Sequence, residues 1–146
     1  KGDRKQADAR YQQIVSQDDA YEGLLDFLAD VGSADEHYRI AVSYLQQDEF
    51  DRALERLDQA LRADPEMGDA YNTKAVILTN KGEYDEAYAL LEEAEVLMPT
   101  HPGVRLNMAI VRYLQGRRHE AAVIYRQVLE MDDRYEGFLD FLQAPK

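Results

Sequence analysis

Small and apolar residues recur along the chain at a regular interval, as Ala41, Ala75 and Ala109 illustrate. When the chain is written in rows of 34, three rows align, over residues 34–67, 68–101 and 102–135. The aligned positions are Ile40, Ala41, Tyr44, Ala53, Leu57, Ala60 and Pro65 in the first row, Lys74, Ala75, Leu78, Ala87, Leu91, Ala94 and Pro99 in the second, and Met108, Ala109, Arg112, Ala121, Tyr125, Val128 and Asp133 in the third. A fixed period of this length is typical of helical-repeat architectures.

Each row predicts two helices joined by a tight turn. The first helix of the first row has one face at helical spacing, formed by His37, Ile40, Ala41 and Tyr44. Ser33 and Glu36 form a capping-box pair at its start. Pro65 ends the second helix of that row, and Gly82 and Gly116 supply the turns of the later rows.

The alanines of each row lie where its two helices are expected to cross, because a larger side chain there would overpack at a cost of roughly 1–3 kcal/mol. No single helix pair can bury its own apolar face, so the pairs must stack on one another. The sequence therefore predicts an all-α protein, a right-handed α-solenoid of antiparallel helix pairs.

This spacing of small, aromatic and proline residues resembles the tetratricopeptide repeat over residues 34–135. The third row departs from the repeat pattern, with Arg112 where an aromatic residue is usual and Asp133 where proline is usual. Terminal repeats are often atypical. The resemblance implies a protein-binding domain in which the first helices line a concave face and the second helices lie on the convex face.

The N-terminal residues align with the middle of a row, since residues 1–7 match 81–87 and 115–121. We expect residues 1–33 to hold the second helix of a half repeat, followed by a short extra helix. The inner face of that half repeat would be Ala7, Tyr11, Ile14 and Val15. The hypothesis is that the chain is a fragment of a longer protein, cut inside a repeat.

An eleven-residue segment occurs twice, at 18–28 and at 132–142, with nine of the eleven positions identical. In the first copy, Tyr21, Leu24, Leu25 and Leu28 fall at helical spacing. One interpretation is a capping helix that closes the last repeat, over residues 136–146. The other is an internal ligand that occupies the groove of its own or of a neighbouring copy.

The predicted partner-binding groove follows from the concave placement that the resemblance implies. It consists of three equivalent positions on each first helix: Tyr38, Val42 and Leu45, then Asn72, Val76 and Thr79, then Leu106, Ile110 and Tyr113. Val42, Val76 and Ile110 occupy the same position in each row and would align into an apolar stripe, which suits one face of a partner helix. The alternative is that this stripe belongs partly to the core.

Tetratricopeptide domains that bind chaperone C-terminal tails use a carboxylate clamp of Lys, Asn and Arg on this face. The corresponding positions hold Asp35, Tyr38, Val42, Asp69, Asn72 and Val76, of which Asn72 alone is clamp-like. We therefore expect no binding of such tails. The asparagine ladder of glycosyltransferase-type repeats is also missing, with Arg39 and Thr73 at two of its three positions.

The net charge of -12 argues against nucleic acid as a partner, and the sequence has no cysteine for a disulfide or thiolate site. No apolar run is long enough to insert this segment into a membrane. Cytoplasm and bacterial periplasm both remain open. His37, His101 and His119 are scattered, so we expect no metal site. The sequence also has no phosphate-binding glycine loop, no nucleophile elbow and no Cys–His arrangement, so we expect no cofactor and no catalysis.

These observations favour a scaffold or adaptor domain of bacterial type within a larger assembly or secretion-related protein. Its partner would be a protein or peptide, with a copy of itself and its own duplicated terminal helix among the candidates. The alternative is a small acidic chaperone for an export substrate. A third hypothesis places an enzyme outside this chain, with the repeats as its appendage.

Overall fold

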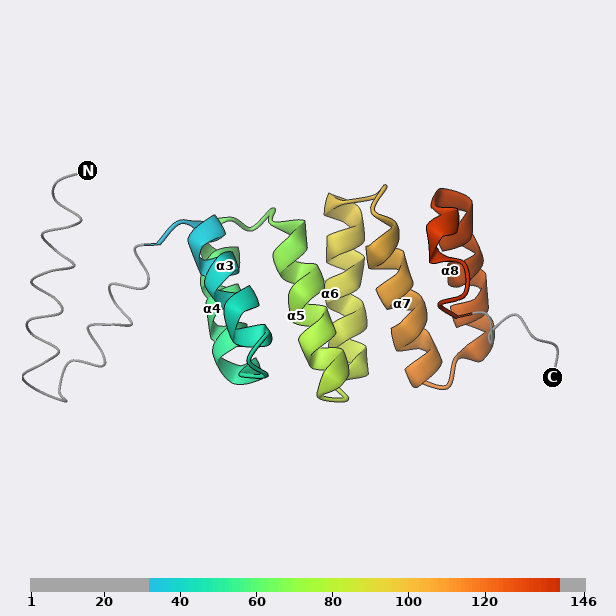
Figure 1. The fold of residues 1–146 in the computed structure, drawn as a ribbon, viewed down its shortest axis with the longest axis horizontal. Helices are drawn as coiled ribbons and strands as arrows, with labels where there is room; N and C mark the ends of the chain where they lie inside the picture. Colours follow the sequence, from blue (N-terminus) through green and yellow to red (C-terminus); the bar gives the residue numbers. More distant parts are fainter. Residues whose placement is uncertain (1–31, 140–146) are drawn as a thin grey trace, which may run out of the picture. The chain divides into compact units, whose positions relative to one another are not determined.

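The computed structural model describes residues 32–139, and the regular elements in that range are all helical. The chain divides into two compact units, Lys1–Ser33 and Ala34–Lys146, and the description below concerns the second. The expected half repeat and extra helix in residues 1–33 lie outside the described residues, as do residues 140–146. The helices are α3 (Ala34–Leu45), α4 (Phe50–Ala63), α5 (Gly68–Asn80), α6 (Tyr84–Leu97), α7 (Pro102–Leu114) and α8 (Arg118–Met131), followed by the 3-10 helix η2 (Asp133–Tyr135) (Figure 1).

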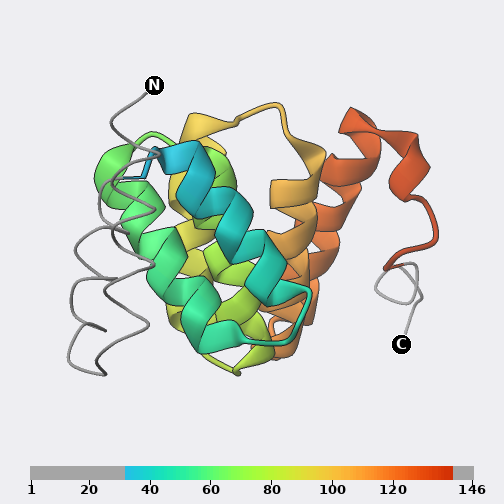
Figure 2. The same cartoon turned by 60° about the vertical axis from the view of Figure 1, so that its left-hand side comes forward.

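The six α-helices form three antiparallel pairs, α3–α4, α5–α6 and α7–α8, and each pair packs on the next through α4–α5 and α6–α7. Figure 2 shows α3 and α4 running side by side in opposite directions. One helix pair falls in each row of the sequence alignment. The predicted all-α helical-repeat fold is confirmed.

The turns inside the three pairs share one backbone conformation. Gly82 and Gly116 have φ angles of 82° and 80°, and Asp48, at the equivalent position of the first pair, has a φ of 59°. Glycine adopts such positive angles without a steric penalty, whereas aspartate does so at some cost. The glycine turns therefore follow from the sequence, and Asp48 shows that the first pair makes the same turn with a less suitable residue.

The core lies along the helix crossings, where the small side chains are completely buried. The predicted alanines of the crossings, Ala41, Ala53, Ala75, Ala87, Ala109 and Ala121, are all at 0% exposure. Helix α7 contributes to two clusters, because Val104, Met108 and Val111 pack toward α5 and α6 while Leu106 and Ala109 pack toward α8. Helices α5 and α7 thus each join their own partner helix to the preceding pair.

Ile40 departs from the expected packing face, since it is 39% exposed. The residues at the same position of the second and third rows, Lys74 and Met108, both face the preceding helix pair. Lys74 contacts Asp58 of α4, and Met108 is buried against α5 and α6. Within residues 32–139 no helix pair precedes α3, so Ile40 has no such neighbour there.

The C-terminal segment also differs from the expectation as far as it is described. Residues 136–139 form a turn and a bend instead of the start of a capping helix. Gly137 takes a φ of 93°, which is incompatible with a continuous α-helix.

Candidate protein-binding surface

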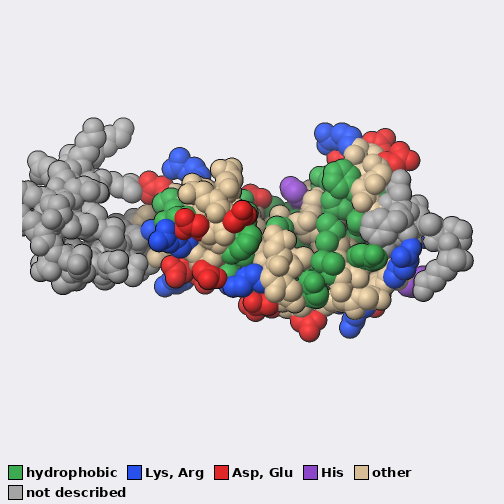
Figure 3. All heavy atoms as spheres, turned by 60° about the horizontal axis from the view of Figure 1, so that its bottom comes forward, with side chains coloured by type: hydrophobic (Ala, Val, Ile, Leu, Met, Phe, Trp, Pro, Cys, Tyr) green, Lys and Arg blue, Asp and Glu red, His purple; other side chains and the backbone are tan. Residues whose placement is uncertain are grey.

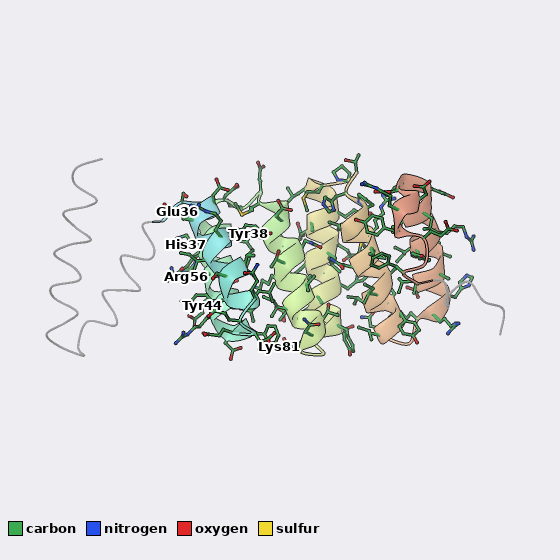
Figure 4. All side chains as sticks on the ribbon, in the orientation of Figure 1. Glu36, His37, Tyr38, Tyr44, Arg56 and Lys81 are labelled. Atoms are coloured by element: carbon green, nitrogen blue, oxygen red, sulfur yellow. The ribbon has the colours of Figure 1, made fainter. Side chains whose placement is uncertain are left out.

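The predicted groove positions lie on α3, α5 and α7, and most of them are partly accessible. Val42, Val76 and Ile110 are half-buried, as are Tyr38, Leu45, Asn72 and Thr79, while Tyr113 is 37% exposed. In Figure 4, Tyr38 lies on the side of α3 that faces α5. These residues therefore offer a surface that combines an apolar stripe with a few polar groups.

Hydrogen bonds join adjacent first helices across this surface. The Tyr38 hydroxyl lies 3.2 Å from the Thr73 hydroxyl, and Asn107 Nδ2 donates to Asn72 Oδ1 over 2.9 Å. The Thr79 hydroxyl, by contrast, bonds within its own helix α5, where it donates to the carbonyl of Ala75 over 2.8 Å. The polar side chains thus hold the first helices together, and the Asn72 oxygen already accepts one hydrogen bond.

Leu106 differs from the other groove positions because it is buried, with 7% exposure, in a cluster with Tyr125, Val128 and Leu139. Ile110 packs against the same cluster while remaining partly exposed. At the α7 end, the predicted stripe therefore belongs partly to the core. This is the alternative that the sequence left open, and its physical reason is that the C-terminal segment covers this part of the surface.

A second recurring feature, which sequence reasoning missed, lies at the turn end of the helix pairs. Lys81 Nζ donates to Asp51 Oδ1 over 2.9 Å, and Gln115 Nε2 donates to Asp85 Oδ1 over 2.7 Å. Both contacts join residues 30 apart and link neighbouring pairs. The hydrogen bond to Asp51 and the charge of that carboxylate raise the pKa of Lys81 above its usual value. Lys81 is labelled in Figure 4 at the turn after α5.

These contacts line two open hollows, of about 390 Å³ beside Lys81 and about 280 Å³ beside Gln115. The sequence does carry a signal for these contacts. An aspartate, Asp51 or Asp85, lies at the start of the second helix of one pair. A hydrogen-bond donor, Lys81 or Gln115, lies 30 residues later, in the turn after the first helix of the next pair. Both hollows are widely open, and the contacts that line them join successive helix pairs.

Arg112, which stands where an aromatic residue is usual, stacks on an aromatic ring of the preceding pair. Its guanidinium carbon lies 3.5 Å from the centre of the Tyr88 ring. Its Nε lies 3.3 Å from Glu120 Oε2, and its Nη1 donates to Gln115 Oε1 over 2.9 Å. Only 17% of the side chain is exposed.

Charge is unevenly distributed over the three pairs. The third pair with its turn, residues 102–131, carries five arginines, Arg105, Arg112, Arg117, Arg118 and Arg126, against two carboxylates, Glu120 and Glu130. The rest of the chain is strongly acidic. On the face presented in Figure 3, hydrophobic side chains gather mostly toward the α7–α8 end, whereas charged side chains cluster around α3 and α4. The third pair is thus a basic and apolar region in an acidic protein.

The described residues contain no group of three or more His, Cys, Asp or Glu side chains that could hold a metal ion. His37 is buried, whereas His101 and His119 are exposed at the starts of different helices. Among the helices of residues 32–139, none has the length and apolar character needed to cross a membrane.

Comparison with known proteins agrees with this architecture. Two profiles described as tetratricopeptide repeat match residues 38–102 and 78–137, so that together they cover all three helix pairs. The chain therefore belongs to the tetratricopeptide repeat family. Such a domain is a protein–protein interaction scaffold that binds peptides or proteins, and the repeat fold is typically non-enzymatic.

Three relatives place the chain among proteins of this class. BBSome complex member BBS4 of Bos taurus is 30% identical over 106 residues, which cover 71% of this chain and 20% of the relative. The first tetratricopeptide domain of Spaghetti (RPAP3), bound to the HSP90 peptide SRMEEVD, superposes with a TM-score of 0.71 at 18% identity, over 75% of this chain and 87% of that one. Pseudomonas aeruginosa pilF superposes with a TM-score of 0.64 at 27% identity, over 69% of this chain and 46% of that one.

The chain spans about a fifth of the length of the BBS4 relatives that it matches. The likeness to the Spaghetti domain, at 18% identity, shows the fold alone.

Proposed function

We propose that this domain binds a polypeptide segment along the face formed by α3, α5 and α7, as a scaffold or adaptor within a larger assembly. The observation that supports the proposal is the stripe of Val42, Val76 and Ile110, each half-buried on successive first helices. A solvated helix face does not require apolar residues at these positions, and an aligned stripe of them suits the apolar face of a partner.

The polar groups around the stripe support a segment bound chiefly through apolar contacts. Asn72 already accepts from Asn107, and Asp35 and Asp69 bring negative charge near the places where a carboxylate clamp would need cations. Although the Spaghetti domain of the same fold binds an acidic HSP90 peptide, we propose that this chain does not bind such tails. Its preferred segment would be amphipathic, with apolar side chains spaced to meet successive repeats.

The experiment is a selection of binders from a random twelve-residue peptide library, followed by calorimetric titration of a selected peptide against two variants. Val76→Glu places a charge at the centre of the stripe. Val96→Glu is the matched control, because Val96 is 77% exposed on α6, a second helix. We expect Val76→Glu to weaken binding at least tenfold and Val96→Glu to leave it unchanged. A library without binders, or equal affinities for the two folded variants, would contradict the proposal.

A further inference from the structure

The described part of the second eleven-residue copy, residues 132–139, has a defined conformation. Asp132 Oδ1 accepts from the backbone nitrogen of Arg134 over 3.0 Å and holds the turn that begins η2. Gly137 then takes a positive φ of 93° within a turn. Leu139 follows and is buried, with 8% exposure. The segment is therefore packed against the domain through particular side chains.

These side chains lie on the third helix pair. The Tyr125 hydroxyl donates to the carbonyl of Tyr135 over 2.8 Å, and Leu139 belongs to the same buried cluster as Leu106 and Tyr125. A Cβ on Gly103 would lie 3.7 Å from the Tyr135 hydroxyl. The segment thus covers the α7 end of the first-helix face, where Leu106 was expected to meet a partner.

The first copy of the segment keeps the residues that make these contacts. Tyr21, Gly23 and Leu25 correspond to Tyr135, Gly137 and Leu139. The two positions that differ correspond to Arg134, whose side chain is 86% exposed, and Phe138, which is 63% exposed. The differences between the copies therefore fall where the docked copy faces solvent.

Charge complementarity favours the same pairing. Residues 18–28 carry four carboxylates, Asp18, Asp19, Glu22 and Asp26, and no basic residue. The third pair carries five arginines against two glutamates. Complementary charge raises the rate of encounter and disfavours docking on the acidic first and second pairs.

We propose that the surface of α7 and α8 is a docking site for this segment, and that its partner is residues 18–28 of a second copy of the chain. The chain's own residues 132–139 occupy the site and must be displaced. Tyr21 and Leu25 are the anchors that take the places of Tyr135 and Leu139. This inference rests on the proposed function, because it names one partner for one end of the same face.

A tethered segment competes at an effective concentration of the order of millimolar, so the test must weaken the internal copy. In the full-length chain, Leu139→Asp removes the buried anchor. Phe138→Asp is the matched control at the adjacent exposed position. A fluorescein-labelled peptide of residues 18–28, DDAYEGLLDFL, is titrated against both variants and the parent by fluorescence anisotropy. A second peptide carries Tyr21→Ala and Leu25→Ala.

We expect the peptide to bind the Leu139→Asp chain at least tenfold more tightly than the parent or the Phe138→Asp chain. The doubly substituted peptide should lose at least tenfold in affinity. Equal affinities for the three chains, absence of binding, or indifference to the two anchors would overturn the inference. If circular dichroism shows that Leu139→Asp is unfolded, Leu139→Ala replaces it under the same criteria.

The Val76→Glu variant separates this inference from the proposed function. Val76 lies at the centre of the face and not in the cluster that holds Leu139. If the peptide of residues 18–28 failed to bind the Leu139→Asp chain, the effect of Val76→Glu on the library-selected peptide would still test the proposed function. Conversely, if the library-selected peptide bound Val76→Glu and Val96→Glu with equal affinity, the proposed binding at the centre of the face would be rejected. The docking of residues 18–28 on α7 and α8 would not be affected.

Discussion

The guanidinium carbon of Arg112 lies 3.5 Å from the centre of the Tyr88 ring, so that a cation of α7 stacks on an aromatic ring of α6. The contact joins the third helix pair to the second. Because the side chain is only 17% exposed, the stacked pair is largely shielded from water, which strengthens cation–π attraction.

We predict that Arg112→Ala destabilises the domain by about 1–2 kcal/mol, through loss of the stacking and of the contact with Glu120. Arg112→Tyr, which restores the residue type usual at this position, should retain most of the stability. Chemical denaturation followed by circular dichroism measures both, with Arg126→Ala at an exposed position of α8 as the control. A loss below 0.3 kcal/mol (about the size of a neutral surface change) for Arg112→Ala would contradict the assignment.

The left-handed turn at Asp48 leads to a second prediction. Asp48→Gly should stabilise the first pair by about 0.5–1 kcal/mol, because glycine adopts the φ of 59° without strain. Gly82→Ala should cost about 1–2 kcal/mol through backbone strain alone, since no atom lies within 4 Å of the added Cβ. Shifts of the two denaturation midpoints in the same direction would refute this account.

A third prediction concerns the close approach of α5 and α6 at Ala75, which is completely buried. Ala75→Leu should overpack this crossing and destabilise the domain by about 1–3 kcal/mol. Ala89→Leu, at an exposed position of α6, should change the stability by less than about 0.5 kcal/mol. Urea unfolding of the two variants beside the parent makes the comparison, and equal effects would be inconsistent with tight packing at Ala75.

The turn at Asp132 gives a pH-dependent prediction. Hydrogen bonds from the side chain and the backbone of Arg134 lower the pKa of Asp132 below its usual value of 3.8. Since the folded pKa is the lower one, the ionised carboxylate stabilises the folded turn above pH 3.8, and this contribution is lost as the pH falls through the folded pKa.

Asp132→Asn should therefore lower the urea midpoint near neutral pH, and the difference from the parent should shrink as the pH falls below 3.8. Asp133→Asn, at an exposed neighbouring position, serves as the control. A difference between Asp132→Asn and the parent that stays the same from neutral pH to below pH 3.8 would show that the carboxylate charge plays no part.

The fold was largely predictable because its determinants are local and periodic. The alanines at the crossings recur in every row and the turn glycines Gly82 and Gly116 in two of them, so that each is read directly from its row. The positive φ of Asp48 was not anticipated, because aspartate is compatible with several turn conformations.

The surface was harder to predict, since it depends on contacts between rows. The stacking of Arg112 on Tyr88 and the ion pair of Lys81 with Asp51 join residues from neighbouring pairs, and residue type alone does not specify such partners. Leu106 was assigned to the groove from its register, but whether that position is open depends on where the segment ending at Leu139 packs. A periodic pattern identifies which face a residue occupies, and non-periodic segments decide what covers it.

The central claim, that the first-helix face binds a polypeptide segment, is tested most directly by nuclear magnetic resonance with the ¹⁵N-labelled full chain and a library-selected peptide. We predict that the largest amide shifts fall on α3, α5 and α7 around Val42, Val76 and Ile110, with small shifts on α4 and α6. Shifts concentrated on the second helices, around Val96 for example, would contradict the claim.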